Sequence, residues 1–308
     1  MKNSIPLLSL LALSACTGIE EYQAPASPYT LEASIAINDA WECAAPETAS
    51  TRAETPDLKY LIYLFGTDNK AIGAPGGSMT DANKSRSFDG KITATGTYTL
   101  YGLANVLSGE YISHSSNTSI TPSSTMALST AAAPNDVCLG KETLAVTATQ
   151  QAYTKSVTVK HIMSKLALAV NNVPADITSM SITLPSQANT FDFNGTFTYA
   201  KNEENADVPV SQTLTLSKAA AANQDGTYKW SCEPAIVFPC ATGTTSMPIY
   251  IIWSSASVGS KTVSTTSTYC CLSGKNLSLS TTWSEAYRTS ATITTADWSA
   301  VEEGTFPW

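Results

Sequence analysis

The residues of this chain best suited to chemistry are its seven cysteines. One stands near the N-terminus, and the other six are spread along the sequence: Cys43, Cys138, Cys232, Cys240, Cys270 and Cys271. An even number of cysteines in an exported chain is typical of disulfide bonding, so these six are candidate disulfide residues, and the sequence leaves their pairing open. Zinc binding is the competing interpretation. No Cys-x-x-Cys pair and no His-bearing cluster in the sequence supports it.

The two histidines give little support for catalysis. His114 lies in the polar stretch "YISHSSN", whereas His161 shares a strand face with Val157 and Val159, which predicts a packed, hydrogen-bonded side chain rather than a general base. The sequence contains no nucleophile elbow, zinc-protease motif, phosphate-binding loop or dinucleotide-binding loop. We therefore expect no catalytic residues, no cofactor and no metal, and an enzyme is the least favoured class.

The charge and the aromatic content of the chain limit the kinds of partner that it could bind. The chain has only 17 Lys and Arg residues and a net charge of −8, so it offers no basic surface for nucleic acid. The six tryptophans are expected mostly in the core. The alternative is that exposed ones stack on sugar rings, which would make the chain a non-polymerising, carbohydrate-binding surface lipoprotein.

The N-terminal segment "MKNSIPLLSLLALSAC" has the pattern of a signal peptide over residues 1–15, with one positive charge and an apolar run too short for a membrane span. Its end, Leu-Ser-Ala-Cys, resembles the lipobox of bacterial lipoproteins. In that interpretation Cys16 is the lipidated first residue and residues 16–28 form a tether. Acyl chains on Cys16 would then anchor the chain to the outer membrane.

Strand patterns fill most of the remaining sequence, and these strands must position the cysteines, histidines and tryptophans named above. "LEASIAI" (31–37) alternates apolar and polar residues, and "LKYLIYLF" (58–65) is apolar on both faces, as in a central strand covered on both sides. "FDFNGTFTY" predicts a hairpin with a two-residue turn at Asn194 and Gly195. Many short strands separated by turn signals favour an all-β fold of two β-sandwich domains in tandem, over residues 29–155 and 156–308.

Arg52 is one of three arginines in the chain, with Arg86 and Arg288. It alone lies between the alternating first strand and the apolar second one, in a small, polar, proline-bearing stretch of the kind that proteases reach. The bond between Arg52 and Ala53 is therefore a candidate cleavage site. The competing interpretation is an ordinary exposed loop arginine.

Taken together, several stretches resemble the fimbrillin-like family of type V pilus subunits. The resemblance rests on the lipobox, the first strand, "TRA" at 51–53 and the strand in "DLKYLIYLFGTDNKAIG". Further similarity lies in "GTYTLYGLANV" (96–106), "VKHIMSKLALAV" (159–170) and the C-terminal "LSGKNLSLSTTW" and "ITTADWSAVEEGTFPW". These stretches span most of the chain.

The resemblance implies two transthyretin-like β-sandwich domains and assembly by strand addition. Pilin members of the family are exported as lipoproteins and cut after an arginine or lysine, which removes the first strand and opens a groove for a strand of another subunit. Here the removable strand would be 31–37. The implied partners are other pilus subunits, the outer membrane through the lipid, and glycans or proteins on host or bacterial surfaces. The implied location is the cell outer membrane or the fimbrium.

Cys43 bears on this mechanism because it lies upstream of the candidate cleavage site. A disulfide from Cys43 to the body would hold the cut strand in place. The chain would then act uncut, as an anchor or accessory subunit retained by its lipid.

Overall fold

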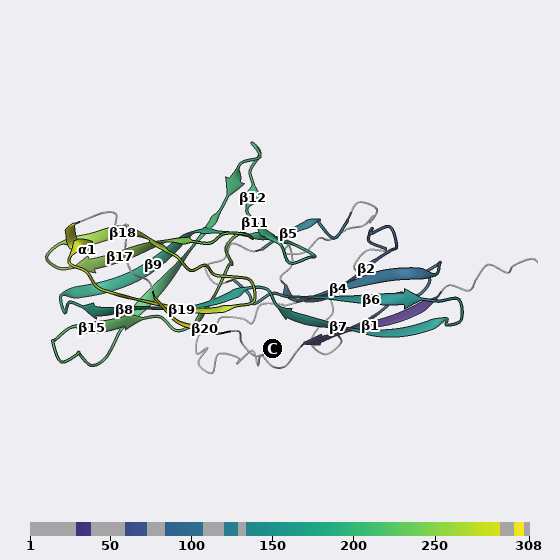
Figure 1. Ribbon diagram of the computed structural model, residues 1–308, viewed down its shortest axis with the longest axis horizontal. Coiled ribbons are helices and arrows are strands. Elements are labelled where there is room, and N and C mark those ends of the chain that lie inside the picture. Colours follow the sequence, from purple (N-terminus) through teal and green to yellow (C-terminus); the bar gives the residue numbers. More distant parts are fainter. Residues whose placement is uncertain are drawn as a thin grey trace, which may run out of the picture.

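The structure is a computed structural model, and it describes residues 29–37, 59–72, 84–106, 120–128, 134–289 and, for the backbone alone, 299–304. These residues form an elongated molecule whose two halves lie end to end (Figure 1). Apart from the short helix α1 (Ala286–Thr289), the regular elements are strands. The all-β class predicted from the sequence is therefore confirmed.

The N-terminal half is a sandwich made by one sheet that folds over on itself. Its strands follow the order β2-β4-β6-β7-β1-β3, but β6 and β7 share only two residue pairs, Cys138 with His161 and Leu139 with Lys160. Beyond this corner the two layers face each other, because a Cβ atom on Gly102 of β4 would touch Val157 of β7. The strands are β1 (Thr30–Ile37), β2 (Lys59–Phe65), β3 (Ser85–Ser87), β4 (Gly96–Val106), β6 (Cys138–Val146) and β7 (Ala152–His161).

β2 is covered on both faces, as its apolar sequence predicts. Tyr60, Ile62 and Leu64 lie in the core between the two layers, while alternate residues such as Tyr63 and Phe65 lie in a second core on the opposite face. The position within the sheet differs from the prediction, because β2 stands at the end of the strand order and not at its centre. Coverage by a further layer, rather than a central position, explains its apolar sequence.

That further layer joins the two halves of the molecule. It is a small sheet of β5 (Thr125–Ala127), β10 (Thr190–Asp192) and β11 (Phe197–Thr198), so one strand comes from the N-terminal half and two come from the C-terminal half. Phe193 packs edge-on against Tyr63 and Phe65 of β2, with ring centroids 4.8 and 5.2 Å apart. A shared apolar core therefore links the two sandwiches.

The C-terminal half repeats the folded-over arrangement. Its order is β18-β17-β9-β14-β15-β8-β19-β20, with β16 also paired to β8, and β14 meets β15 through only two residue pairs. One core containing the buried Trp230, Trp253 and Trp283 fills this sandwich. The strands are β8 (Ser164–Val173), β9 (Ile177–Gln187), β14 (Val210–Lys218), β15 (Tyr228–Ser231), β16 (Ala235–Val237), β17 (Met247–Ser255), β18 (Gly259–Ser267), β19 (Asn276–Thr282) and β20 (Ser299–Gly304).

Two details differ from the sequence patterns. The predicted division between residues 155 and 156 falls inside β7, which pairs within the N-terminal sandwich as far as His161. The predicted two-residue turn is wrong: only Gly195 has a positive φ, of 77°, and Phe193 lies in a longer loop. This loop is held by Asp192 Oδ1, which accepts bonds from the Asn194 and Thr196 backbone amides at 2.9 Å each.

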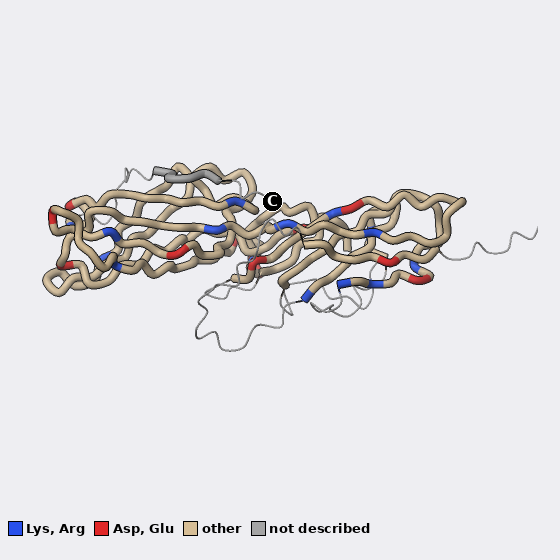
Figure 2. Tube along the Cα trace, turned by 90° about the horizontal axis from the view of Figure 1, so that it is seen from below, with Lys and Arg blue, Asp and Glu red and all other residues tan. Residues whose placement is uncertain are grey.

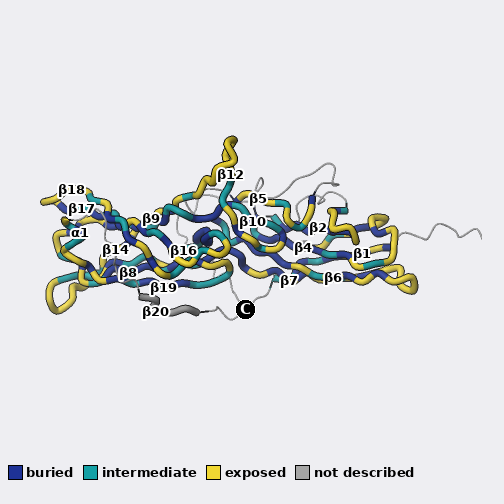
Figure 3. The backbone as a smooth tube through the Cα atoms, turned by 45° about the horizontal axis from the view of Figure 1, so that its top comes forward, coloured by how far each residue is buried: buried dark blue, intermediate teal, exposed yellow. Residues whose placement is uncertain are grey.

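The remaining strands, β12 (Ala200–Lys201) and β13 (Asp207–Val208), form a hairpin that projects from the body (Figure 1). Exposed residues concentrate in this hairpin and in the turns at both ends of the molecule, whereas buried residues run along the strands (Figure 3).

Candidate functional site

The first strand of the fold, β1, is inserted between β7 and β3. It pairs with β7 in parallel along its whole length, from Thr30 opposite Ala152 to Ile37 opposite Val159. On its other edge it pairs antiparallel with β3 over three residues. Both neighbours of β1 are distant from it in sequence, so no hairpin turn joins β1 to either of them. Loss of β1 would therefore break no tight turn within the body.

The side chains of β1 complete the core of the N-terminal sandwich. Leu31, Ala33 and Ile35 alternate inward and are buried, and Tyr29 just before them lies 6.3 Å from the ring of Tyr153. Full burial of a leucine or isoleucine side chain contributes about 1.5–3 kcal/mol each. Removal of β1 would leave an apolar groove beside an unpaired edge of β7, and any replacement strand would need apolar residues at alternate positions.

The wall of this groove opposite β7 is β3, which has a contact with β2 in addition to its pairing with β1. Arg86 of β3 donates a hydrogen bond from Nη1 to the Ile62 carbonyl oxygen of β2 at 3.1 Å, and its guanidinium lies 4.6 Å over the ring of Phe88. Burial lowers the pKa of Arg86, but its ordinary value is so high that the group stays charged. β3 is thus tied to β2 as well as to β1.

The residues predicted for export and processing lie outside the described residues. These are Cys16, Cys43, Arg52 and Ala53. The described chain leaves β1 at Ile37 and resumes at Lys59, where β2 begins, so Arg52 belongs to the connection between the two strands. A cut at this connection would separate β1 from the rest of the chain.

No disulfide joins the five described candidate cysteines to one another, and four of them lie in or against the C-terminal core. The thiols of Cys240 and Cys270 lie close enough for each to shift the pKa of the other. Burial, followed by the neighbouring Cys240, raises the pKa of the Cys270 thiol to about 12. Cys271 and Cys232 also have raised pKa values because they are buried.

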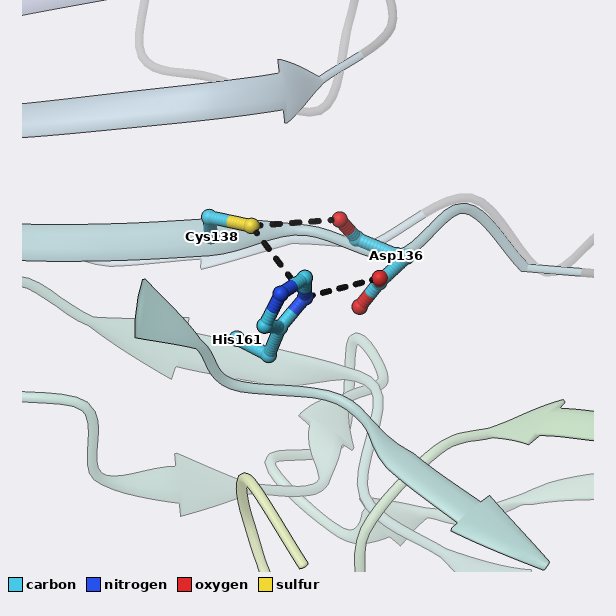
Figure 4. Close-up of side chains that lie close together, drawn as sticks. All are labelled: Asp136, Cys138 and His161. Carbon is cyan, nitrogen blue, oxygen red and sulfur yellow. Dashed lines mark hydrogen bonds and ion pairs between the residues drawn. The ribbon is translucent and has the colours of Figure 1, made fainter. Parts of the chain in front are cut away.

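The fifth thiol, Cys138, belongs to a polar cluster at the corner between β6 and β7 (Figure 4). His161 Nδ1 lies 2.7 Å from Asp136 Oδ2 and 3.5 Å from Cys138 Sγ, and Cys138 Sγ donates to the Asp136 carbonyl oxygen at 3.6 Å. Asn105, at a positive φ of 60° in β4, donates from Nδ2 to the same carbonyl oxygen at 3.1 Å. The cluster confirms the prediction of a packed, hydrogen-bonded His161.

This cluster is not arranged as a catalytic triad. In a nucleophile–base–carboxylate relay, the nucleophile and the carboxylate occupy different nitrogens of the imidazole. Here Cys138 and Asp136 both approach Nδ1. The side chain of His161 is only 4 % exposed, so a substrate would have no direct path to it.

Reasoning from the sequence missed this His-bearing cluster. Asp136 and Cys138 are separated by one residue, which places both near the start of β6, but His161 is brought to them by the pairing of Cys138 with His161 across the corner. The available signal was a Cys and a His, each at the end of an alternating strand. Their register is a property of the folded sheet.

Other surface features give no support to sugar or nucleic-acid binding. The three described tryptophans, Trp230, Trp253 and Trp283, are buried, which confirms the core interpretation for them. The other three lie outside the described residues: Trp41, Trp298 and Trp308. Charged residues are scattered along both halves in Figure 2, with no basic stripe on the part of the chain that the structure describes.

Comparison with known proteins identifies the fold. No family model matches the chain, and no curated protein matches it in sequence. A solved structure of a putative cell adhesion protein from Bacteroides eggerthii matches with a TM-score of 0.52 and 12 % identity, over 90 % of this chain and 95 % of that one. The chain has the fold of that cell adhesion protein. The match shows the fold alone, and this is the all-β fold that the fimbrillin-like resemblance implies.

Two further solved structures are similar at lower scores. The fimbrial anchor protein Mfa2 from Porphyromonas gingivalis has a TM-score of 0.47 and 10 % identity, over 82 % of this chain and 90 % of that one. A putative cell adhesion protein from Parabacteroides distasonis has a TM-score of 0.47 and 8 % identity, over 89 % and 96 %. None of the three structures is named as an enzyme. Among the described residues, no helix has the length and apolar character needed to span a bilayer.

Proposed function

We propose that this chain is a pilus-associated surface adhesin or fimbrillin-like pilus subunit, without enzymatic activity, that assembles by strand exchange at the β1 position. Cleavage between Arg52 and Ala53 would separate β1 from β2. A strand from another subunit would then pair with β7 and fill the groove that Leu31, Ala33 and Ile35 occupy in the intact chain.

The observation that carries this proposal is the placement of β1. It is paired on both edges, contributes three buried side chains, and is linked to the body by the one connection that contains Arg52. An open edge of β7 and an apolar groove are both unfavourable in water, which would drive the uptake of a new strand. The fold shared with a putative cell adhesion protein supports a role at the cell surface.

Export as a lipoprotein completes the proposal. Acylated Cys16 would hold the intact chain at the outer membrane, and partners would be other subunits together with glycans or proteins on neighbouring surfaces. If Cys43 is disulfide-bonded to the body, β1 stays in place after a cut, and the chain acts as an anchor or accessory subunit. A carbohydrate-binding lipoprotein that does not polymerise is not favoured, because the described tryptophans are buried.

The test compares wild type with Arg52→Ala in a Gram-negative host that carries a trypsin-like surface protease. Intact mass of the surface protein, measured with and without reductant, should show loss of residues 16–52 in wild type alone. Higher-order ladders on gels should follow that loss. Lys70→Ala, in the exposed turn after β2, is the matched control for removal of a surface cation and should behave as wild type. Ladders formed equally by Arg52→Ala would overturn the proposal.

A further inference from the structure

The structure assigns a second site to this chain, independent of strand exchange: we propose that Asp136, Cys138 and His161 bind a zinc ion at the corner of the N-terminal sandwich. The three side chains offer a carboxylate oxygen, a thiol sulfur and an imidazole nitrogen, and these ligand atoms all lie within 4.8 Å of one another (Figure 4). Cys138 begins β6, Asp136 lies two residues before it, and His161 ends β7.

The ligand types select the metal. Magnesium and calcium prefer oxygen ligands, whereas a mixed set of sulfur, nitrogen and oxygen suits zinc and cobalt(II). Three protein ligands and one open position for water is an arrangement that zinc adopts in proteins. The side chain of Asp136, at 14 % exposure, is more exposed than that of His161 and marks the side from which an ion and its water would enter.

The spacing of the ligands is close to that of a zinc centre. With zinc–sulfur bonds of about 2.3 Å and zinc–nitrogen or zinc–oxygen bonds of about 2.0 Å, tetrahedral geometry separates sulfur from nitrogen by roughly 3.5 Å and nitrogen from oxygen by roughly 3.3 Å. Cys138 Sγ and His161 Nδ1 already lie 3.5 Å apart. Asp136 Oδ2, at 2.7 Å from Nδ1, would need to move back by roughly 0.6 Å.

The protein holds these ligands in a defined arrangement. Cys138 and His161 are directly opposite each other in the register of β6 and β7, and both are buried. Asn105 holds the Asp136 backbone through its bond to the carbonyl oxygen at 3.1 Å, and its Nδ2 also lies 3.9 Å from Cys138 Sγ. Supporting hydrogen bonds of this kind orient the direct ligands of zinc sites.

Charge balance also favours a divalent ion. Zinc, one carboxylate, one thiolate and a neutral imidazole sum to zero, which suits a buried position. On binding, the Cys138 S–H bond breaks and a Zn–S bond forms, and the thiol proton passes to solvent. His161 must present the lone pair of Nδ1, so a proton on Nδ1 is lost to solvent. If the ring was neutral, Nε2 takes up a proton in its place. Affinity therefore falls as the pH is lowered.

The experiment uses the full chain after signal removal, stripped with a chelator under reducing conditions and reloaded with zinc or cobalt(II). Wild type should retain about one zinc per chain after gel filtration, and the cobalt form should show a thiolate-to-cobalt charge-transfer band. Cys138→Ser should lose both signals. The matched control is Cys270→Ser, which removes a thiol of the C-terminal half and should keep both.

The measurement stays decisive even if Cys138→Ser folds poorly. Because Cys138 is buried, it reacts with an alkylating reagent only when the corner opens; in wild type, bound zinc should slow this reaction, as read by peptide mapping, and should leave the alkylation of Cys232 unchanged. The assignment would be overturned if the wild-type chain retained no zinc. It would also be overturned if the cobalt spectrum persisted in Cys138→Ser and was lost in Cys270→Ser.

Discussion

Gly140 of β6 lies against the backbone of Thr158 in β7, so closely that a Cβ atom at position 140 would stand 2.1 Å from the Thr158 carbonyl oxygen. This contact comes two residues after the pair of Cys138 with His161, where the two strands stop pairing and the sheet folds over. The corner of the N-terminal sandwich therefore requires a residue without a side chain at this position. The layers can face each other across the core because β6 and β7 cross here at close range.

Gly140→Ala should destabilise the chain strongly. The new methyl group would meet backbone atoms, which cannot rotate away, so we expect a loss above the roughly 1–3 kcal/mol that is usual for overpacking. Urea unfolding followed by circular dichroism measures the loss. Gly102→Ala is the control, because the atoms nearest to its Cβ would be side-chain atoms of Val157 and Val159, with a methyl of each at 3.0 Å, and not backbone atoms. Equal losses in the two variants would contradict the role of the corner.

Leu31→Ala should weaken the hold on β1. Leu31 is fully buried in the core between the layers, and a large-to-small change at such a site typically lowers stability by about 2–5 kcal/mol. Glu32→Ala, at the exposed neighbouring position, should change stability by no more than about 0.5 kcal/mol. The same urea titration measures both variants. A similar effect of the two substitutions would mean that β1 is held by its backbone alone.

The strands around the groove were largely predictable from the sequence, and the clusters were not. β1 and β2 follow from alternation and from a two-faced apolar run, since burial of side chains sets both patterns. The edge position of β2 was missed because the layer that covers it includes Phe193, which is distant in sequence. The contact of Cys240 with Cys270 and that of Cys138 with His161 depend on how separate segments meet, which local periodicity does not encode.

The acid stability of the C-terminal half should depend on Asp176. Arg288 donates two hydrogen bonds to its carboxylate, at 3.0 and 2.6 Å, and these bonds hold the pKa of Asp176 below its ordinary value of 3.8. A folded-state pKa below the unfolded one stabilises the folded chain above pH 3.8, and this contribution is lost as the pH falls through the folded-state pKa. Because the pair is partly exposed, it contributes at most about 1 kcal/mol.

Asp176→Asn should therefore lower the urea midpoint slightly at neutral pH and leave it unchanged at strongly acidic pH, where the wild-type carboxyl is also protonated. Glu204→Gln, in the exposed loop between β12 and β13, reports the general effect of removing a surface carboxylate. A loss from Asp176→Asn that persists unchanged in acid would show that the side chain acts through packing and not through its charge.

Cys240 and Cys270 should form a disulfide under oxidising conditions. The Cys240 backbone amide donates to the Cys271 carbonyl oxygen at 2.8 Å, which fixes the two segments side by side, and the thiols of Cys240 and Cys270 are close enough to shift each other's pKa. Oxidised glutathione would take up the two electrons and two protons as two S–H bonds give way to one S–S bond. Since burial raises the pKa of Cys270 to about 12, the reaction should be slow at neutral pH and accelerate about tenfold per pH unit as the thiolate fraction grows.

Closing the loop from 240 to 270 should stabilise the chain by about 3–4 kcal/mol on the chain-entropy model. Peptide mapping without reductant identifies the bond, and thermal unfolding with and without reductant measures its effect. Cys232→Ser should keep both the bond and the stabilisation, whereas Cys240→Ser should lose both. A bond between Cys232 and Cys240 instead would contradict the arrangement of the C-terminal core, because there the Cys240 thiol lies against Cys270.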